Sequence, residues 1–322
     1  MSILSRRALL GAASAISSSA SASSAEKAWP TRPLRLVVPF QTGGTMDTVI
    51  RLFAPAAAQN LGQPIVIENR AGAAGAIGTA EVARAAPDGY TLLATGSSYT
   101  VVPLLQRNLT FSLSDLAPVT RLSSSPVVLV VPFSLPVRSL AEFVALAKSK
   151  PGELAFASTG IGTTAHLVTE IIQRSAGIEL VHVPYRGPAL PDLLAARLQL
   201  MLPTLVEVQD LLAEGRLRAL AVGYDTRLDL LPDVPTLGEL GYPGIPASAN
   251  IGIVVPAATP LAIRTRIEAA FRAAGRAPQV RQRLEENGII PIASSSADYA
   301  ELLGREQARF AEVIQQANIT LN

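Results

Sequence analysis

The chain has 322 residues, of which 49% are hydrophobic and 16% charged, and it contains no cysteine. This composition predicts a globular α/β protein with much buried sheet, and the length suits two lobes with a core each. The absence of cysteine excludes disulfides, thiolate ligands and a thiol nucleophile, and with His166 and His182 as the only histidines no metal site is expected. No cofactor is expected either, and no basic cluster with interleaved aromatic residues points to nucleic acid.

The N-terminus has the pattern of an export signal. Arg6 and Arg7 follow Ser5, a short apolar stretch runs to Ile16, and small residues continue to Ala25. The stretch is shorter than the roughly 20 residues that span a bilayer. We therefore expect a twin-arginine signal peptide over residues 1–25 and a mature protein in the periplasm. Cleavage there lowers the basic residues from 27 to 25, against 25 acidic ones, so the mature chain is formally neutral.

The first part of the body alternates strand-like and helical patterns. Strands are expected over 34–38, 65–67 and 91–94, and helices over 47–61 and 77–85. This βαβαβ series predicts a parallel sheet with right-handed crossovers. The glycines of the segment 72–78 are attributed to tight packing between strand and helix, because no Gly-Lys-Ser/Thr ends the segment as in a phosphate loop.

A second series follows residue 125. Strands are expected over 127–131, 154–157, 180–183, 198–202 and 217–222, with helices from 139 and over 164–176, 188–196 and 206–213. A strand at 251–255, a helix from 260, a strand at 289–292 and a helix from 296 complete the chain. The passages around Ser125 and Ala249 are expected to cross between lobes. Lobe one then comprises residues 29–125 plus 248–322, and lobe two comprises residues 126–247, each a mostly parallel sheet flanked by helices.

Two loops share one design, in which a strand ends, glycines and hydroxyl residues follow, and a helix begins. They are Phe40-Gln41-Thr42-Gly43-Gly44-Thr45 and Ser158-Thr159-Gly160-Ile161-Gly162-Thr163-Thr164. A helix start offers unpaired N–H groups and a partial positive charge, so each loop is expected to hold an anionic oxygen. One such loop in each lobe predicts a ligand clamped in the cleft between the lobes.

Several residues allow two interpretations. Asp47 can cap the helix after the first loop or meet a ligand amino group. Arg186 can contact a carboxylate or lie on the surface. Both histidines are interpreted as packed and hydrogen-bonded, with none in the clamp, so binding is expected to follow pH only through the carboxylates of the ligand.

An enzyme is the alternative from a different class. Gly160-x-Gly162-x-x-Ala165, with Glu179 further on, matches the dinucleotide fingerprint of a nicotinamide-dependent oxidoreductase. However, Glu179 precedes the following strand instead of ending it, and no convincing proton donor accompanies it. A hydrolase lacks support because there is no Gly-x-Ser-x-Gly elbow. We therefore expect a binding protein.

Ordered blocks of sequence from Trp29 to Ile319 carry a family resemblance. They are Trp29-Pro30-Thr31-Arg32-Pro33, Val38-Pro39-Phe40 with Gly43-Gly44 and Asp47, Glu68-Asn69-Arg70-Ala71-Gly72, Ala86-Pro87-Asp88-Gly89-Tyr90, Ala157-Ser158 to His166-Leu167, His182-Val183-Pro184-Tyr185-Arg186-Gly187, Leu217-Arg218-Ala219-Leu220-Ala221-Val222 and Leu231-Pro232-Asp233-Val234-Pro235-Thr236. With these blocks the chain resembles the periplasmic solute receptors of tripartite tricarboxylate transporters, the Bug proteins.

The resemblance implies a two-lobed, type II-like periplasmic binding protein, monomeric and without catalysis, that delivers a small carboxylate to membrane transporter subunits. The ligands of the family are mono-, di- and tricarboxylates or acidic amino acids. A sensor that presents the same ligand to a signalling partner is the alternative. The loops implied to contact the ligand run from Phe40 to Asp47, from Gly96 to Thr100, with Ser97 and Ser98, and from Ser158 to Thr164.

The sequence departs from the family pattern at positions near the ligand. Gln41-Thr42 and Thr45-Met46 flank the double glycine, where Pro-Ala and Ala-Thr are common. Pro203-Thr204 stands where an Asp often follows the strand, and Ala249-Asn250 replaces an aromatic pair. Pro203 is therefore counted among the ligand-binding positions, while the identity of the carboxylate is left open.

Overall fold

The structure is a computed structural model that describes residues 29–106, 108–185, 187–245, 247–316 and 319. The predicted signal peptide of residues 1–25 and Arg186 lie outside the described residues. Across these ranges, none of the helices combines the length and the apolar character that crossing a bilayer would require.

The first half is built on three parallel strands. β1 (Leu34–Val38) lies between β2 (Ile65–Asn69) and β3 (Thr91–Thr95). Helix α2 (Thr45–Leu61) buries its apolar stripe against them, including Val49, Ile50 and Phe53, all fully buried. The 3₁₀ turn η1 (Ala73–Gly75) leads into α3 (Ala76–Ala83). The strands and helices predicted for this part of the chain are all present.

One helix was not predicted from the sequence. The sequence predicts a loop over residues 96–100, but α4 (Ser98–Leu105) begins there, with Ser97 as its N-cap residue. Its Tyr-Thr-Val-Val run favours strand and it contains Pro103, so local propensity gives no helical signal. Burial of Tyr99, Val101 and Val102 stabilises the helix through packing.

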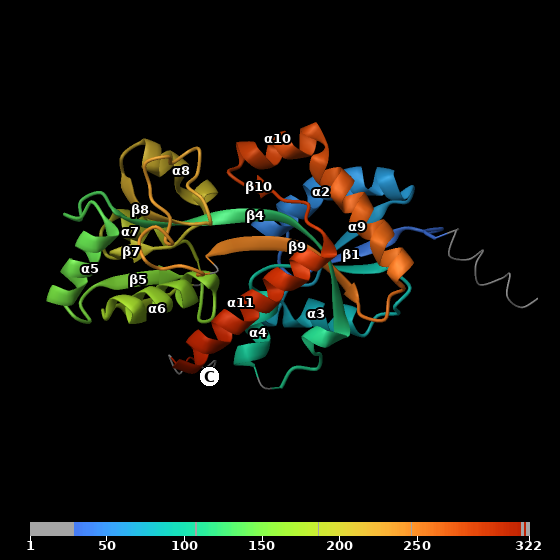
Figure 1. Ribbon diagram of the computed structural model, residues 1–322, viewed down its shortest axis with the longest axis horizontal. Helices are drawn as coiled ribbons and strands as arrows, with labels where there is room; N and C mark the ends of the chain where they lie inside the picture. The colour runs from blue at the N-terminus through green and yellow to red at the C-terminus, as the bar shows by residue number, and fades with distance from the viewer. Residues whose placement is uncertain (1–28, 107, 186, 246, 317–318, 320–322) are drawn as a thin grey trace, which may run out of the picture.

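Two long antiparallel strands connect the halves (Figure 1). β4 (Leu116–Pro132) pairs with β9 (Ser248–Pro256) from Leu116↔Pro256 to Pro126↔Ser248. From Val127↔Gly223 onward, the same strand pairs with β8 (Leu217–Gly223). The change of partner falls next to the predicted boundary between the lobes; the division itself stays a prediction.

The second half repeats the parallel design. β5 (Ala155–Ser158) lies between β6 (Val181–Pro184) and β7 (Leu200–Met201), and β7 joins β4. Four helices flank these strands: α5 (Leu140–Ser149), α6 (Thr164–Ala176), α7 (Leu190–Leu194) and α8 (Leu205–Ala213). Fully buried Phe143 and Phe156 lie in the core between sheet and helices.

The C-terminal segment returns to the first half and then reaches the second. The single helix expected from 260 is two helices, α9 (Leu261–Arg276) and α10 (Pro278–Glu286), because Ala277 is extended ahead of Pro278. After β10 (Ile290–Pro291) comes α11 (Ser296–Gln316), which crosses the molecule in Figure 1. Its apolar end packs with residues of α4 and α6, in a cluster of Val101, Leu167, Ile171, Phe310, Val313 and Ile314.

Candidate functional site

The first loop, residues 40–44, connects β1 to α2. Residues 41–45 are exposed, and Gly44 is the N-cap residue of the helix. Gly43 has φ +86°, a conformation that favours glycine. A Cβ on Gly44 would meet only the carbonyl of Gln41, at 3.6 Å, so open space lies above this position. The loop presents the unpaired N–H groups of a helix start to that space.

Asp47 anchors this loop from below. The side chain is 2% exposed, and its Oδ2 accepts hydrogen bonds from Gly43 N at 2.9 Å and Arg51 Nε at 2.8 Å. Its Oδ1 accepts one from Asn69 Nδ2 at 3.0 Å, and the same amide also donates to the carbonyl of Phe40. The hydrogen bond from Arg51, assisted by those from Gly43 and Asn69, lowers the pKa of Asp47 to about 2. The side chain thus holds the loop ahead of α2, with no side-chain cap bond at the helix start itself, and its contact with a ligand stays a prediction.

The second loop, residues 158–163, connects β5 to α6. Thr163 is the N-cap residue, Gly162 has φ +79° and is buried, and Thr159 is exposed. The loop is folded on itself, because Ser158 Oγ and Thr163 Oγ1 both donate to the carbonyl of Gly160, at 2.9 and 2.8 Å. The hydroxyl proton of Thr163 is therefore used within the loop, which leaves its oxygen lone pair for another donor.

Two stacked histidines lie beneath this loop. The ring centroids of His166 and His182 are 4.0 Å apart, and Phe156 stacks on His182 at 4.7 Å. Gly162 N donates to His166 Nδ1 at 3.0 Å, and His182 Nε2 lies 2.7 Å from Ser158 Oγ. The prediction that both histidines are packed and hydrogen-bonded is confirmed. Both histidines hold the second loop from beneath, and the absence of a histidine from the ligand clamp stays a prediction.

The two loops have the same backbone conformation at the N-cap and a glycine of positive φ immediately before it. The N-cap residues Gly44 and Thr163 have φ/ψ of −74°/168° and −72°/159°. In each loop the residue before the N-cap is a glycine with positive φ, and its N–H donates to the side chain four residues later. Asp47 and His166 are thus equivalent anchors. The Gly-x-x-x-Asp and Gly-x-x-x-His spacings were the signal in the sequence that identifies them.

Helix α4 lies between the two loops. At its start, a Cβ on Gly96 would fall 2.8 Å from Met46 Cε of α2, next to the first loop. Further along, a Cβ on Gly162 of the second loop would collide with Leu105 Cδ1 and would also meet Val101. The predicted loops 40–47, 96–100 and 158–164 therefore come together around the helix α4.

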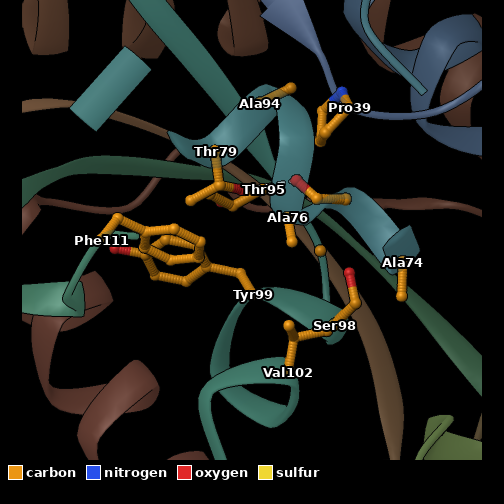
Figure 2. A pocket seen from close by; sticks show the side chains of 12 residues that line it. Pro39, Ala74, Ala76, Thr79, Ala94, Thr95, Ser98, Tyr99, Val102 and Phe111 are labelled. Atoms are coloured by element: carbon orange, nitrogen blue, oxygen red, sulfur yellow. Dashed lines mark hydrogen bonds between the residues drawn. The ribbon is translucent and has the colours of Figure 1, made fainter. Parts of the chain in front are cut away.

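A small pocket opens beside the first loop (Figure 2). Pro39, η1 and the start of α4 surround it, and its lining consists of Pro39, Ala74, Gly75, Ala76, Thr79, Ala94, Thr95, Gly96, Ser98, Tyr99, Val102 and Phe111. Ser98 is the predicted site residue among them. A Cβ on Gly78 would lie 3.0 Å from Pro39 Cβ and 3.1 Å from the carbonyl of Arg70. This close approach confirms tight packing for Gly78, whereas Gly72 and Gly75 have positive φ, and η1 is a wall of the pocket that the sequence did not reveal.

The remaining predicted residues take part in hydrogen bonds of the sheet and of helix starts. Pro203 is buried, and its carbonyl accepts from Val128 N at 2.9 Å, so it extends the sheet. Thr204 after it begins α8 through a capping box with Glu207. Ser97 is half-buried, and its carbonyl accepts from Thr100 Oγ1. In the part of the chain that the structure describes, no group of three or more His, Asp or Glu side chains could hold a metal ion.

Comparison with known proteins gives a consistent result. Residues 49–319 match the family described as the tripartite tricarboxylate transporter family receptor, TctC. The protein BugT of Bordetella pertussis is 34% identical over 301 residues, which cover 91% of each chain.

Two solved structures from Rhodopseudomonas palustris are similar over the whole fold. One, solved with adipate, has a TM-score of 0.77 at 34% identity and covers 91% of this chain and 99% of its own. The other, MatC with bound malate, has a TM-score of 0.74 at 32% identity and covers 89% of this chain and all of its own. The family resemblance and the periplasmic-binding-protein fold inferred from the sequence are both confirmed.

Proposed function

Because the chain belongs to the tripartite tricarboxylate transporter receptor family, we propose that it binds a small carboxylate between two lobes and delivers it to a membrane transporter. Members of this family are periplasmic solute-binding proteins and not enzymes. The division into lobe one, residues 29–125 plus 248–322, and lobe two, residues 126–247, belongs to this proposal. It is supported by the change of partner along β4 at Pro126 and Val127.

The observation that carries the proposal is the pair of equivalent loops at the starts of α2 and α6. The N–H groups of Gly43 and Gly162 are turned inward to their anchors. The N–H groups that follow, at Gly44, Thr45 and Thr164, belong to the first turns of helices and are the donors for a carboxylate. Each helix start would then bind one carboxylate group of the ligand.

The electrostatics of the loops favour an anion of modest charge. No charged residue occurs in 40–45 or in 158–165, and the charge of Asp47 is balanced by Arg51. Binding therefore rests on backbone donors and on the partial positive charge of each helix start. The adipate and malate in the two related structures are dicarboxylates, which supports a ligand with one carboxylate for each loop.

Export is part of the proposal. Arg6 and Arg7 ahead of a short apolar stretch support cleavage near Ala25 and release into the periplasm. N-terminal sequencing of the periplasmic protein tests this step. A first residue between about 23 and 29 is expected, and a periplasmic chain that still carries Arg6 would contradict it.

The experiment for the function is a thermal-shift screen of the mature protein against mono-, di- and tricarboxylates, with malate and adipate included. A ligand at 100 times its Kd adds about 2.7 kcal/mol to the free energy of unfolding, which raises Tm by several degrees. A variant with Gly44→Val is the control, because its side chain would occupy the space above the first loop. If no carboxylate shifts Tm, or if the bound carboxylate is turned over, the proposal fails.

Delivery needs its own test. Uptake of the labelled ligand by cells should require both this receptor and the membrane subunits of the transporter. Uptake that persists without the receptor, or a transcriptional response that persists without the membrane subunits, would favour the sensor alternative.

A further inference from the structure

The two loops are held by anchors of different chemistry. In the first loop the glycine N–H donates to a carboxylate, and in the second it donates to an imidazole nitrogen. Both anchors occupy the third residue of their helix, after equivalent N-cap residues. A carboxylate oxygen accepts whenever it is ionised, whereas Nδ1 of an imidazole accepts only while it carries no proton.

The hydrogen bond fixes the form of His166. Because Gly162 N donates to Nδ1, this nitrogen is unprotonated and the ring proton of the neutral imidazole is on Nε2. Protonation at Nδ1 would place two N–H groups face to face at 3.0 Å and would remove the anchor. For His182 the outcome differs, because Ser158 Oγ donates to Gly160 and accepts the Nε2 proton, a bond that survives protonation of the ring.

The surroundings of His166 favour the neutral ring. The side chain of His166 is 7% exposed and stacks on His182 of β6, with the ring of Phe156 of β5 at 6.3 Å. Burial, and then the neighbouring His182, lower the pKa of His166 to about 4, and burial lowers that of His182.

Few charged groups face the ring. On α6, Glu170 Oε1 lies 3.8 Å from His166 Nε2, and burial raises the pKa of Glu170. Arg174 of the same helix is directed to the carbonyl of Gln316 of α11. α6 also packs against α4 and α11 through an apolar cluster that includes Val101, Leu105, Phe310, Val313 and Ile314.

We propose that neutral His166 is a positioning residue for ligand binding, which holds the second loop in its binding conformation and releases it on acidification, while Asp47 keeps the first loop fixed. That the second loop binds a ligand rests on the proposed function. The pH dependence of the loop rests only on the hydrogen bond from Gly162 to His166. When the loop opens, His166 returns to its usual pKa of 6.5, above the folded value of about 4. The closed loop therefore has its full stability above about pH 6.5 and loses it as the pH falls toward 4.

The Gly43 amide is an internal control in the same molecule. The usual pKa of Asp47 is 3.8 and its folded value is about 2, so its contribution is complete above about pH 4 and is lost only below. As the pH falls from 6.5 to 4, the hydrogen bond of the Gly162 N–H should therefore weaken, and that of the Gly43 N–H should stay unchanged.

Amide hydrogen exchange of the ligand-free mature protein, followed by NMR, measures this difference. The protection factor of Gly162 is expected to fall by up to about tenfold per pH unit below 6.5, about 300-fold in all. That of Gly43 should stay constant. In His166→Asn, whose Oδ1 can accept in place of Nδ1 and does not titrate, the pH dependence of Gly162 should vanish. Parallel profiles for the two glycines, or a dependence that persists in His166→Asn, would overturn the proposal.

Calorimetry at pH 7 with malate and adipate as probes tests the positioning role. His166→Leu removes the acceptor and should weaken binding by about tenfold or more, while His166→Asn should stay within about threefold of the wild type. Equal affinities of His166→Leu and wild type would overturn the proposal. If the wild type binds neither probe in calorimetry nor any carboxylate in the screen, the proposed function fails, and the exchange profiles still decide whether His166 controls the loop.

Discussion

The first and second loops meet their helices with the same backbone conformation and have different supports. Gly43 and Gly162 share a positive φ, the N-cap residues share φ and ψ, and each glycine N–H donates four residues ahead. The first loop is fixed by a buried carboxylate with three donors around it. The second is fixed by hydrogen bonds to two imidazoles, from Gly162 N to His166 and between Ser158 and His182, and by hydroxyl contacts within the loop.

Loops of similar geometry can therefore differ in their sensitivity to pH. An ionised carboxylate with a pKa of about 2 holds its loop throughout the physiological range of pH. A neutral imidazole holds its loop only while it stays unprotonated, and its loop also contacts α4 through Gly162 and Leu105. We therefore expect the first loop to be the fixed half of the clamp and the second to be the half that responds.

The largest effect is expected from removal of the first anchor. Asp47→Ala leaves the N–H groups of Gly43 and Asn69 and the guanidinium of Arg51 without their acceptor. Because these are charge-assisted bonds to a buried group, the free energy of unfolding should fall by about 2–3 kcal/mol, and ligand binding should be lost. Urea denaturation checks the first value. Wild-type stability in Asp47→Ala would show that the carboxylate is not an anchor.

A side chain at Gly44 should remove binding without loss of stability. Gly44 has an ordinary φ of −74°, and the nearest atom to an added Cβ is 3.6 Å away, so Gly44→Val is compatible with the fold. Its methyl groups would occupy the space where the ligand meets the N–H groups. Calorimetry should detect no binding, and Tm should stay within a few degrees. Normal affinity would place the ligand elsewhere.

Alanine at the two positive-φ glycines forms a matched pair. Gly43→Ala and Gly162→Ala impose the same backbone strain, about 1–2 kcal/mol, but only the second adds a collision, with Leu105. We expect Gly162→Ala to weaken ligand binding more than Gly43→Ala, by roughly tenfold or more, since about 1.4 kcal/mol of added steric conflict is a factor of ten. Kd values at pH 7 give the comparison. An equal loss in both variants would show that α4 does not constrain the second loop.

The smallest effect is expected at Thr163. Thr163→Val keeps the shape and removes the hydrogen bond to the carbonyl of Gly160. The loss should be about 0.5–1.5 kcal/mol in ligand affinity, with little change in Tm. Thr159→Val, at an exposed position of the same loop, is the control. A loss of more than about 2 kcal/mol, roughly thirtyfold in Kd, would indicate that the hydroxyl also contacts the ligand.

The fold was largely predictable because its signals are local. The apolar spacing of α2 and the short strands β1, β2 and β3 follow from periodicity alone. Helix α4 was missed because its residues favour strand and its stability comes from burial of Tyr99 and Val101 against distant elements. The full length of β4 was missed because Ser123, Ser124 and Ser125, all buried, interrupt its apolar pattern.

The two loops of the site could be predicted from the sequence more directly than the side chains that anchor them. Glycine and hydroxyl residues before a helix identify residues 40–45 and 158–164 directly. The role of His166 depends on a bond across one helical turn and on stacking with His182, which follows it by sixteen positions in the chain. The stack cannot be predicted from the sequence because its two residues are far apart in the chain. The spacing of four residues, from Gly43 to Asp47 and from Gly162 to His166, is visible in the sequence and indicates both anchors.

The most direct test of the central claim, that two helix-start loops hold a carboxylate by backbone N–H groups, is an NMR titration of the mature protein at pH 7 with malate and adipate. On saturation, the largest amide shifts should fall at Gly44 and Thr45 in the first loop and at Thr164 in the second. Gly43 and Gly162, whose N–H groups remain on Asp47 and His166, should shift less. Saturable binding that leaves the amides of both loops unshifted would contradict the account.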